Sequence, residues 1–355
     1  KPKYSQKYRS RDNNGNRDLG DIVNSPIVAV GGYLATSAND GMVHIFKKGN
    51  GGDERNYSLK LSYIPGTMPR KDIQNTESTL AKELRTFAEK GYVGDRYGVD
   101  GGFVLREVDN LNGQNRVFMF GAMGFGGRGA YALDLTKADS NNPTAVSLFD
   151  VKNDKNKGNN SAELGYTVGT PQIGKTHNGK YAAFLASGYA TKDINNGDNK
   201  TALYVYDLES NNGTPIAKIE VPNGKGGLSS PTLVDKDLDG TVDIAYAGDR
   251  GGNMYRFDLS SQDPNQWSAR AIFKGDKPIT SAPAISQLKD KRVVIFGTGS
   301  DLSEDDVLST SEQYIYGIFD DDTVANNVNV KLSGLGGGLL EQELKQEDKT
   351  LFLTD

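Results

Sequence analysis

The residues best suited to chemistry lie in one acidic stretch, VDKDLDGTVDIAYAGD, which runs from Val234 to Asp249. Its aspartates occupy positions 1, 3, 5 and 9 of a loop, with glycine at position 6 and threonine at position 7: Asp235, Asp237, Asp239, Asp243, Gly240 and Thr241. Calcium loops supply carboxylates at positions 1, 3 and 5, a backbone carbonyl at position 7 and a glycine for the sharp turn. The pattern predicts one Ca²⁺ bound by the four aspartate side chains and the backbone carbonyl of Thr241.

The elements around this loop are predicted to be strands. An EF-hand requires a bidentate glutamate at position 12, where this chain has Tyr246. The apolar residues before the loop (TLV) and after it (IAYAG) have the pattern of strands rather than of helices. Mg²⁺ is less favoured because it prefers few carboxylates and retained waters. The alternative is an acidic turn that is simply solvated.

Composition excludes several classes of protein. The 355 residues have a formal net charge of −5. The chain has no block of lysine and arginine residues, which a nucleic-acid-binding protein would normally have. The chain has no cysteine, which excludes a disulfide scaffold and thiolate metal sites. No apolar run reaches the length of a membrane span. The polar residues 1–18 are interpreted as the leader at the edge of a piece cut from a longer protein.

Three short patterns recur in the same order along the chain and indicate a β-propeller. A small residue precedes a proline at Pro26, Pro171, Pro231 and Pro283, then comes an apolar strand ending in small residues, then an aromatic strand that usually ends in aspartate. Repeating units that each contain several short strands are typical of propeller blades. Blades must stack, because one blade cannot cover its own apolar faces. We expect an all-β fold, with the propeller over residues 19–333 and a tail over residues 334–355 that is an edge strand or disordered.

One inserted segment is predicted to be helical. Between Thr76 and Gly91, the residues Leu80, Leu84 and Phe87 follow helical spacing. A helix that packs over a blade edge is favoured over a helix that binds a partner.

Other candidate sites are weaker. The glycine run Gly121–Gly129 precedes a strand and not a helix, so it is interpreted as a turn rather than a phosphate loop. His44 is expected to pack in a strand and His177 to lie in a turn, and neither has a second histidine nearby for a transition metal. The segments Asp12–Asp18 and Asp193–Asn199 mix oxygen ligands with glycine and are secondary calcium candidates.

An ordered set of motifs between Leu19 and Asp320 resembles the C-terminal propeller of PilC-type adhesins, which are carried at the tip of bacterial type IV pili. The motifs include LGDIVNSPIVAVGG, FGAMGFGGRGAYALDLT, LGYTVGTPQI, GLSSPTLVDKDLDGTVDIAYAGDRGGNMYRFDLS and VVIFGTGSDLSEDD. The resemblance implies a modified propeller of about seven blades and a structural calcium in the Asp235–Asp243 loop. It also implies an exported protein at the bacterial surface, outer membrane or pilus tip. Its partners would be pilins, minor pilins and a host-cell receptor.

The function that the resemblance implies is not enzymatic: regulation of pilus extension and retraction, twitching and host-cell adherence, and so virulence. The integrin-type Arg-Gly-Asp triplet of some members has no counterpart, so integrin binding is not implied. One alternative is a quinoprotein-like propeller enzyme, although the single tryptophan and the lack of cysteine argue against it. A purely structural, calcium-stabilised scaffold is the other.

Overall fold

Short antiparallel strands joined by turns make up most of the regular structure. The computed structural model describes residues 19–354, with the exception of residues 52–54, 67–68, 72–75, 91–96, 157, 160, 190–199, 211, 290, 324–327 and 330–338. The predicted leader (residues 1–18) and both secondary calcium candidates, Asp12–Asp18 and Asp193–Asn199, therefore lie outside the described residues.

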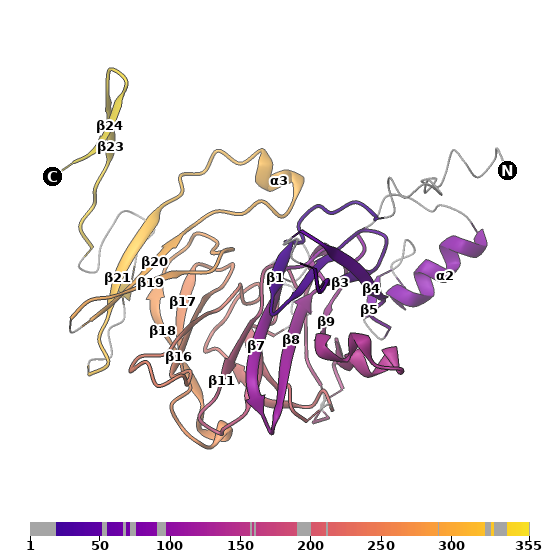
Figure 1. Ribbon diagram of the computed structural model, residues 1–355. Coiled ribbons are helices and arrows are strands. Elements are labelled where there is room, and N and C mark those ends of the chain that lie inside the picture. Colours follow the sequence, from indigo (N-terminus) through magenta and orange to yellow (C-terminus); the bar gives the residue numbers. More distant parts are fainter. Residues whose placement is uncertain are drawn as a thin grey trace.

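The strands form five radial sheets, which we call blades 1 to 5 (Figure 1). Blade 1 contains β1 (Val28–Val30), β2 (Tyr33–Ser37), β3 (Val43–Lys48) and β4 (Tyr57–Tyr63). Blade 2 contains β7 (Phe103–Leu111), β8 (Gln114–Ala122), β9 (Gly129–Asp134) and β10 (Ser147–Lys152). Blade 3 contains β11 (Gln172–Lys175), β12 (Tyr181–Ala186), β13 (Ala202–Asp207) and β14 (Pro215–Glu220).

Blade 4 contains β15 (Thr232–Val234), β16 (Ile244–Gly248), β17 (Asn253–Asp258) and β18 (Ser268–Lys274), and β22 (Val328–Asn329) pairs in parallel with β18. Blade 5 contains β19 (Ala284–Gln287), β20 (Arg292–Gly297) and β21 (Ile315–Asp320). Two small hairpins form sheets of their own: β5 (Pro69–Lys71) with β6 (Glu77–Thr79), and β23 (Leu344–Glu347) with β24 (Thr350–Leu353). The α-helices of the described residues are α2 (Leu80–Lys90) and α3 (Glu304–Val307).

Stacking of consecutive blades builds the core. The innermost strands β1, β7, β11, β15 and β19 are neighbours in that order, and a separate apolar cluster fills each of the four junctions between successive blades. Adjacent residues of one strand serve different junctions, because strand side chains alternate between faces: Phe184 packs toward blade 4 and Leu185 toward blade 2. Burial of each such side chain contributes about 1.5–3 kcal/mol.

Two local devices repeat with the blades. The register shifts between the third and fourth strand in each of blades 1 to 4, and bulges of this kind increase the twist of a sheet. The aspartate that ends the third strand accepts a hydrogen bond from the backbone N–H two residues later in blades 2, 3 and 4: Asp134 from Thr136, Asp207 from Glu209 and Asp258 from Ser260. The recurring aspartate of the sequence pattern therefore forms the turn out of that strand.

The predicted all-β propeller class is confirmed. The described residues nevertheless form five radial sheets, fewer than the expected seven or so. Among these sheets, blades 1 and 5 do not adjoin through their innermost strands, β1 and β19. Between β4 and β7, the described elements β5, β6 and α2 form no blade. The blade number of a complete ring stays a prediction.

The inserted helix packs on the blades, as the sequence predicted. Leu80 is buried in the cluster between blades 1 and 2, and Leu84 packs against the same cluster. Arg70 on β5 forms a buried ion pair with Glu83 on α2, with 2.9 Å between Nε and Oε2. The helix begins at Leu80 rather than Thr76 because Glu77–Thr79 pair with β5 as a strand.

The carboxylate of Asp249 organises the turn that connects β16 to β17. It is fully buried and accepts hydrogen bonds from the backbone N–H groups of Lys225 (3.0 Å) and Asn253 (2.9 Å) and from the hydroxyl of Tyr255 (2.7 Å). Burial, and next the charge of Asp249, raise the pKa of Tyr255, so the tyrosine stays a donor.

We predict that Asp249→Ala lowers the free energy of unfolding by about 3 kcal/mol or more, because it leaves several buried donors without an acceptor. Chemical denaturation measures this change. Asp263→Ala is the matched control, since that aspartate only caps an exposed short turn, and it should cost about 1 kcal/mol or less. Equal losses in the two variants would contradict the role given to Asp249.

Candidate metal centre

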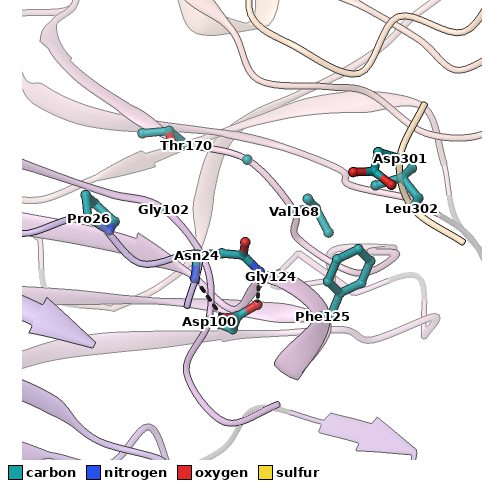
Figure 2. Close-up of a pocket in the computed structure, with 11 residues that line it drawn as sticks. Asn24, Pro26, Asp100, Gly102, Gly124, Phe125, Val168, Thr170, Asp301 and Leu302 are labelled. Carbon is teal, nitrogen blue, oxygen red and sulfur yellow. Dashed lines mark hydrogen bonds between the residues drawn. The ribbon is translucent and has the colours of Figure 1, made fainter. Parts of the chain in front are cut away.

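A cavity of about 350 Å³ lies at one end of the inner strands (Figure 2). Asp100 and Asp301 are the acidic residues of its lining, and Phe125 supplies an aromatic ring. Asp100 is buried and accepts hydrogen bonds from the backbone N–H (3.3 Å) and the side-chain amide (2.7 Å) of Asn24. Burial raises the pKa of Asp100, against the effect of these hydrogen bonds. The Asn24 contact gives Asp100 a structural role, because it joins the start of blade 1 to the start of blade 2.

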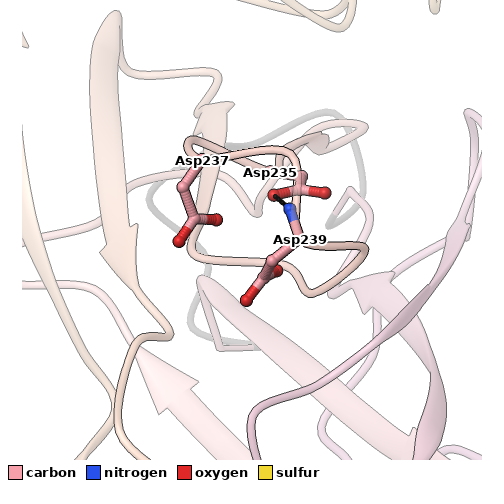
Figure 3. Close-up of side chains that lie close together, drawn as sticks. All are labelled: Asp235, Asp237 and Asp239. Atoms are coloured by element: carbon pink, nitrogen blue, oxygen red, sulfur yellow. Dashed lines mark hydrogen bonds between the residues drawn. The ribbon is translucent and has the colours of Figure 1, made fainter.

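The acidic loop predicted to bind calcium connects β15 to β16. Carboxylate oxygens of Asp235, Asp237 and Asp239 lie within 4.8 Å of one another and form the acidic cluster shown in Figure 3. Asp237 and Asp239 are exposed, and Asp235 is partly exposed. The structure therefore brings together three of the four aspartates at positions that a single cation could bridge.

The loop folds through its own aspartates. Asp235 accepts the backbone N–H groups of Asp239 (3.2 Å) and Gly240 (2.7 Å), and Asp239 accepts the N–H of Thr241 (2.7 Å). Gly240 has a φ of +90°, a conformation that is strained for a residue with a side chain. The glycine at position 6 therefore allows the sharp turn that the sequence predicted.

Asp243, the fourth predicted ligand, is held in other contacts. Its carboxylate accepts the backbone N–H of Lys236 at 2.7 Å, and Oδ1 lies 2.7 Å from Nε2 of His177. His177 lies in the turn between β11 and β12 of blade 3. Asp243 thus closes the base of the loop and connects it to the preceding blade, and its part in binding a metal stays a prediction.

Backbone contacts strengthen the connection to blade 3. Thr241 forms an isolated parallel bridge with Lys175, the last residue of β11, and the N–H of Val242 donates to the carbonyl of Lys175 at 2.8 Å. Thr241 is the residue predicted to offer its carbonyl to calcium, so the candidate ligand set adjoins the junction of blades 3 and 4.

The other side of the loop contacts blade 5. Nζ of Lys236 lies 3.3 Å from Oδ2 of Asp322, which follows β21. Asp322 also accepts Nη1 of Arg256 at 2.8 Å and forms an ion pair with Arg292. Burial opposes ionisation of Asp322, but the hydrogen bond from Arg256, the charge of Arg292 and the hydrogen bond from Lys236 lower its pKa to about 2.

A second, buried carboxylate completes this charged network. Asp320 accepts a hydrogen bond from the hydroxyl of Tyr246, lies 2.8 Å from Nη1 of Arg256 and lies 3.5 Å from Nη2 of Arg270. Burial, followed by the hydrogen bond to Asp320, raises the pKa of Tyr246 to about 12. Blades 4 and 5 are therefore joined by ion pairs as well as by apolar packing.

The donor set of the loop fits a hard cation that takes oxygen ligands. Three convergent carboxylates, with a backbone carbonyl predicted from Thr241, match the ligands that calcium accepts at 2.3–2.6 Å. The loop contains neither cysteine nor methionine, and His177 is directed to Asp243, so nothing in the loop favours a transition metal. Like charges this close repel one another, and a bound cation would remove that repulsion.

The structure also tests two other predictions from the sequence, which concern a glycine run and a histidine. The run Gly121–Gly129 contains a short 3₁₀ turn and leads into β9, which confirms the turn interpretation. His44 is buried in β3, with Nδ1 2.7 Å from Oγ of Ser62 and Nε2 2.9 Å from Oδ2 of Asp40, as expected of a packed strand residue.

Comparison with known protein families shows to which family this chain belongs. The model of the PilY1 beta-propeller domain matches residues 19–355. The chain belongs to this family. The propeller is thus of the type found in the C-terminal part of PilY1, and the crystal structure of the Pseudomonas aeruginosa PilY1 C-terminal domain superposes with a TM-score of 0.61 at 25% identity. That superposition covers 85% of this chain and 60% of the solved chain.

Curated relatives carry the name type IV pilus biogenesis factor PilY1. The protein of Pseudomonas aeruginosa strain PAO1 is 29% identical over 416 residues, which covers 99% of this chain and 32% of that protein. A PilY1 homolog of Xylella fastidiosa is 29% identical over 316 residues, covering 81% of this chain and 19% of that protein. The chain therefore spans about a third or less of the length of these relatives. Among the described residues, no helix is both long and apolar enough to cross a bilayer.

Sequence reasoning missed the residues that tie the loop to its neighbours. His177, Asp322 and Arg292 lie far from the loop in sequence, and only the stacking of blades brings them to it. The short helix α3 was also missed, although a signal existed: Ser303 and Asp306 have capping-box spacing, and both reciprocal hydrogen bonds form.

Asp322 should make the junction of blades 4 and 5 sensitive to acid. Because its pKa is lowered from 3.8 to about 2, ionised Asp322 stabilises the folded state above about pH 4, and this contribution is lost as pH falls through 2. We expect Asp322→Asn to lower the melting temperature at pH 7, and this gap from the parent chain to shrink between pH 4 and pH 2. Differential scanning fluorimetry across this range measures both, with Asp263→Asn as the control. A gap that does not depend on pH would contradict the role of the carboxylate charge.

Proposed function

We propose that this propeller is a non-enzymatic, calcium-stabilised module of a type IV pilus biogenesis factor. The observation that carries the proposal is the convergence of Asp235, Asp237 and Asp239 in a loop that also contacts blades 3 and 5. The relatives are named as pilus biogenesis factors and not as enzymes, which supports the first part of the proposal. The finer role in adhesion and retraction follows from the resemblance of the sequence motifs.

Each residue of the loop has a distinct task in this proposal. Asp235, Asp237 and Asp239 supply carboxylate oxygens, Thr241 supplies its carbonyl, and Asp243 either adds an oxygen or fixes the base of the loop through Lys236 and His177. Bound calcium would supply a compact double positive charge that offsets the repulsion among the carboxylates. Because the loop contacts the blades on both sides, its order limits the movement of blades 3, 4 and 5 relative to one another.

The proposed place of action is the bacterial surface, at the pilus tip or outer membrane, after export. There, the rims of the propeller would contact pilins or minor pilins and a host-cell receptor. An ordered loop would keep the rim next to it in the shape that opposes pilus retraction. The dissociation constant expected for such a loop is on the order of 10⁻⁶ to 10⁻⁴ M, so millimolar extracellular calcium would fill it.

Calcium binding is tested with Asp237→Asn, which keeps the shape of the side chain and removes its charge. The parent chain should bind one calcium in isothermal titration calorimetry, and the variant should bind at least about tenfold more weakly because it loses a carboxylate ligand. At about a hundredfold excess over the dissociation constant, calcium adds about 2.7 kcal/mol to the stability of the parent chain, or about 4 °C in melting temperature.

Asp263→Asn is the matched control for this experiment, since it changes one exposed aspartate outside the loop. It should bind calcium as the parent chain does. A melting temperature of the parent chain that ignores both calcium and chelator would refute the metal site.

The role in pilus biology is tested in cells. We expect Asp239→Asn, exported normally and shown to be free of calcium, to change surface piliation, twitching or adherence. Asp263→Asn should change none of them. If pili and adherence are unaffected by a calcium-free protein, the loop does not act through pilus function.

Two outcomes would favour the rival functions. Reproducible turnover of a substrate after addition of pyrroloquinoline quinone would support a propeller enzyme. A purified domain that binds calcium but neither pilins nor host-cell extracts in a pull-down would support a structural scaffold.

A further inference from the structure

The cavity of about 350 Å³ at one end of the inner strands takes its walls from four blades (Figure 2). Pro26 precedes β1, Gly102 precedes β7 and Thr170 precedes β11, whereas Leu302 belongs to the loop between β20 and β21. Contacts between blades hold these walls: the N–H of Gly102 donates to the carbonyl of Gly169 at 3.0 Å. A Cβ on Gly102 would lie 2.3 Å from Oγ1 of Thr170, so this close approach requires glycine.

The loop of blade 5 reaches the cavity as a folded turn. The carboxylate of Asp306 accepts hydrogen bonds from the hydroxyl of Ser300 (2.8 Å) and from the backbone N–H groups of Leu302 (2.8 Å) and Ser303 (3.1 Å). Asp301 lies within the turn that these bonds close, and it lines the cavity together with Leu302. The position of Asp301 is therefore set by hydrogen bonds of its own loop.

The charge on the cavity wall is negative. Asp100 and Asp301 are the ionisable residues of the described lining, which contains neither lysine nor arginine. Asp100 is only 2% exposed, and its carboxylate accepts hydrogen bonds from Asn24, which is a neutral partner. A buried carboxylate without a positive partner is costly to ionise, and burial accordingly raises the pKa of Asp100. A cation in the cavity would reduce this cost.

Apolar side chains separate the two carboxylates. Figure 2 shows Val168 and Phe125 between Asp100 and Asp301. The ring of Phe125 packs on Tyr97, with 5.5 Å between the ring centroids. An aromatic face attracts an ammonium group, and both apolar side chains can cover methylene groups. Calcium takes six to eight oxygen ligands, so two carboxylates with apolar surface between them fit an organic cation better than a metal ion.

We propose that this cavity binds a linear aliphatic diamine. One ammonium group would pair with Asp100 and the other with Asp301, and the methylene chain would lie along Val168 and Phe125. Two positive charges at the ends of an apolar chain match two carboxylates on either side of an apolar surface. A bound diamine would connect the start of blade 2 to the loop of blade 5, and this site is separate from the acidic loop of blade 4.

The probes are the diamines from 1,3-diaminopropane to 1,6-diaminohexane, titrated into the chain by calorimetry in buffer that contains calcium. We expect one diamine per chain and a best chain length, because the separation of the two carboxylates is fixed. The best diamine should bind about tenfold more tightly than the monoamine of the same length, since the monoamine pairs with one carboxylate only.

Two substitutions test the residues assigned to the ligand. Asp301→Asn should weaken binding of the best diamine about tenfold and remove the preference for a diamine over the monoamine. Phe125→Leu keeps an apolar side chain without the aromatic face, and it should weaken binding about two- to fivefold. Glu304→Gln is the matched control, because it removes one charge from the same loop at an exposed residue outside the described lining. It should bind the diamine as the parent chain does.

A further variant separates this site from the proposed calcium site. Asp237→Asn should weaken calcium binding and still bind the diamine with the affinity of the parent chain, so that either proposal can fail alone. Loss of diamine binding in this variant would place the diamine at the acidic loop and overturn the proposal.

Three other results would also overturn it. The first is that no diamine binds to the folded parent chain at millimolar concentration. The second is that the monoamine or tetramethylammonium binds as tightly as the best diamine, which would indicate a site for a single cation. The third is an equal loss of affinity in Asp301→Asn and Glu304→Gln, which would indicate only a diffuse attraction of positive charge.

Discussion

Blades 2, 3 and 4 each have two apolar faces, and each of these faces packs against a neighbouring sheet that keeps it from water. This requirement arranges the blades around a common axis, and it puts the apolar clusters at the junctions rather than inside any one blade. Short strands are sufficient because neither a single strand nor a single blade has to be stable by itself. The turns and loops between strands are then carried at the junctions, where they contact more than one blade.

The acidic loop illustrates the consequence. Its carboxylates come from one stretch of blade 4, but the groups that hold the loop come from both neighbouring blades: His177 from blade 3 and Asp322 from blade 5. Ordering or loosening the loop therefore changes two junctions at once. A cation at this position would act on the placement of blades 3, 4 and 5 relative to one another.

The sequence predicted what depends on local spacing. The aspartates at positions 1, 3 and 5 and the glycine at position 6 specify the turn. In the structure, the carboxylates of the three aspartates lie close together. The repeated third-strand pattern likewise predicted the blades. What could not be predicted depends on register between segments far apart in the chain: the turn of Asp243 toward His177, the ion pairs of Asp322 and the number of blades. The pattern within one segment does not show which distant residues the stacking of blades will bring next to it.

Hydrogen exchange of the backbone amides, with and without calcium, tests the central claim most directly. If the loop fixes the blades on either side, calcium slows exchange in residues 235–243, and also in the β11–β12 turn around His177 and in residues 320–323 after β21. The β7–β8 hairpin of blade 2, which is remote from the loop, should exchange at the same rate in both conditions. Protection confined to residues 235–243 would contradict the account, because the metal would then order a loop without holding the blades.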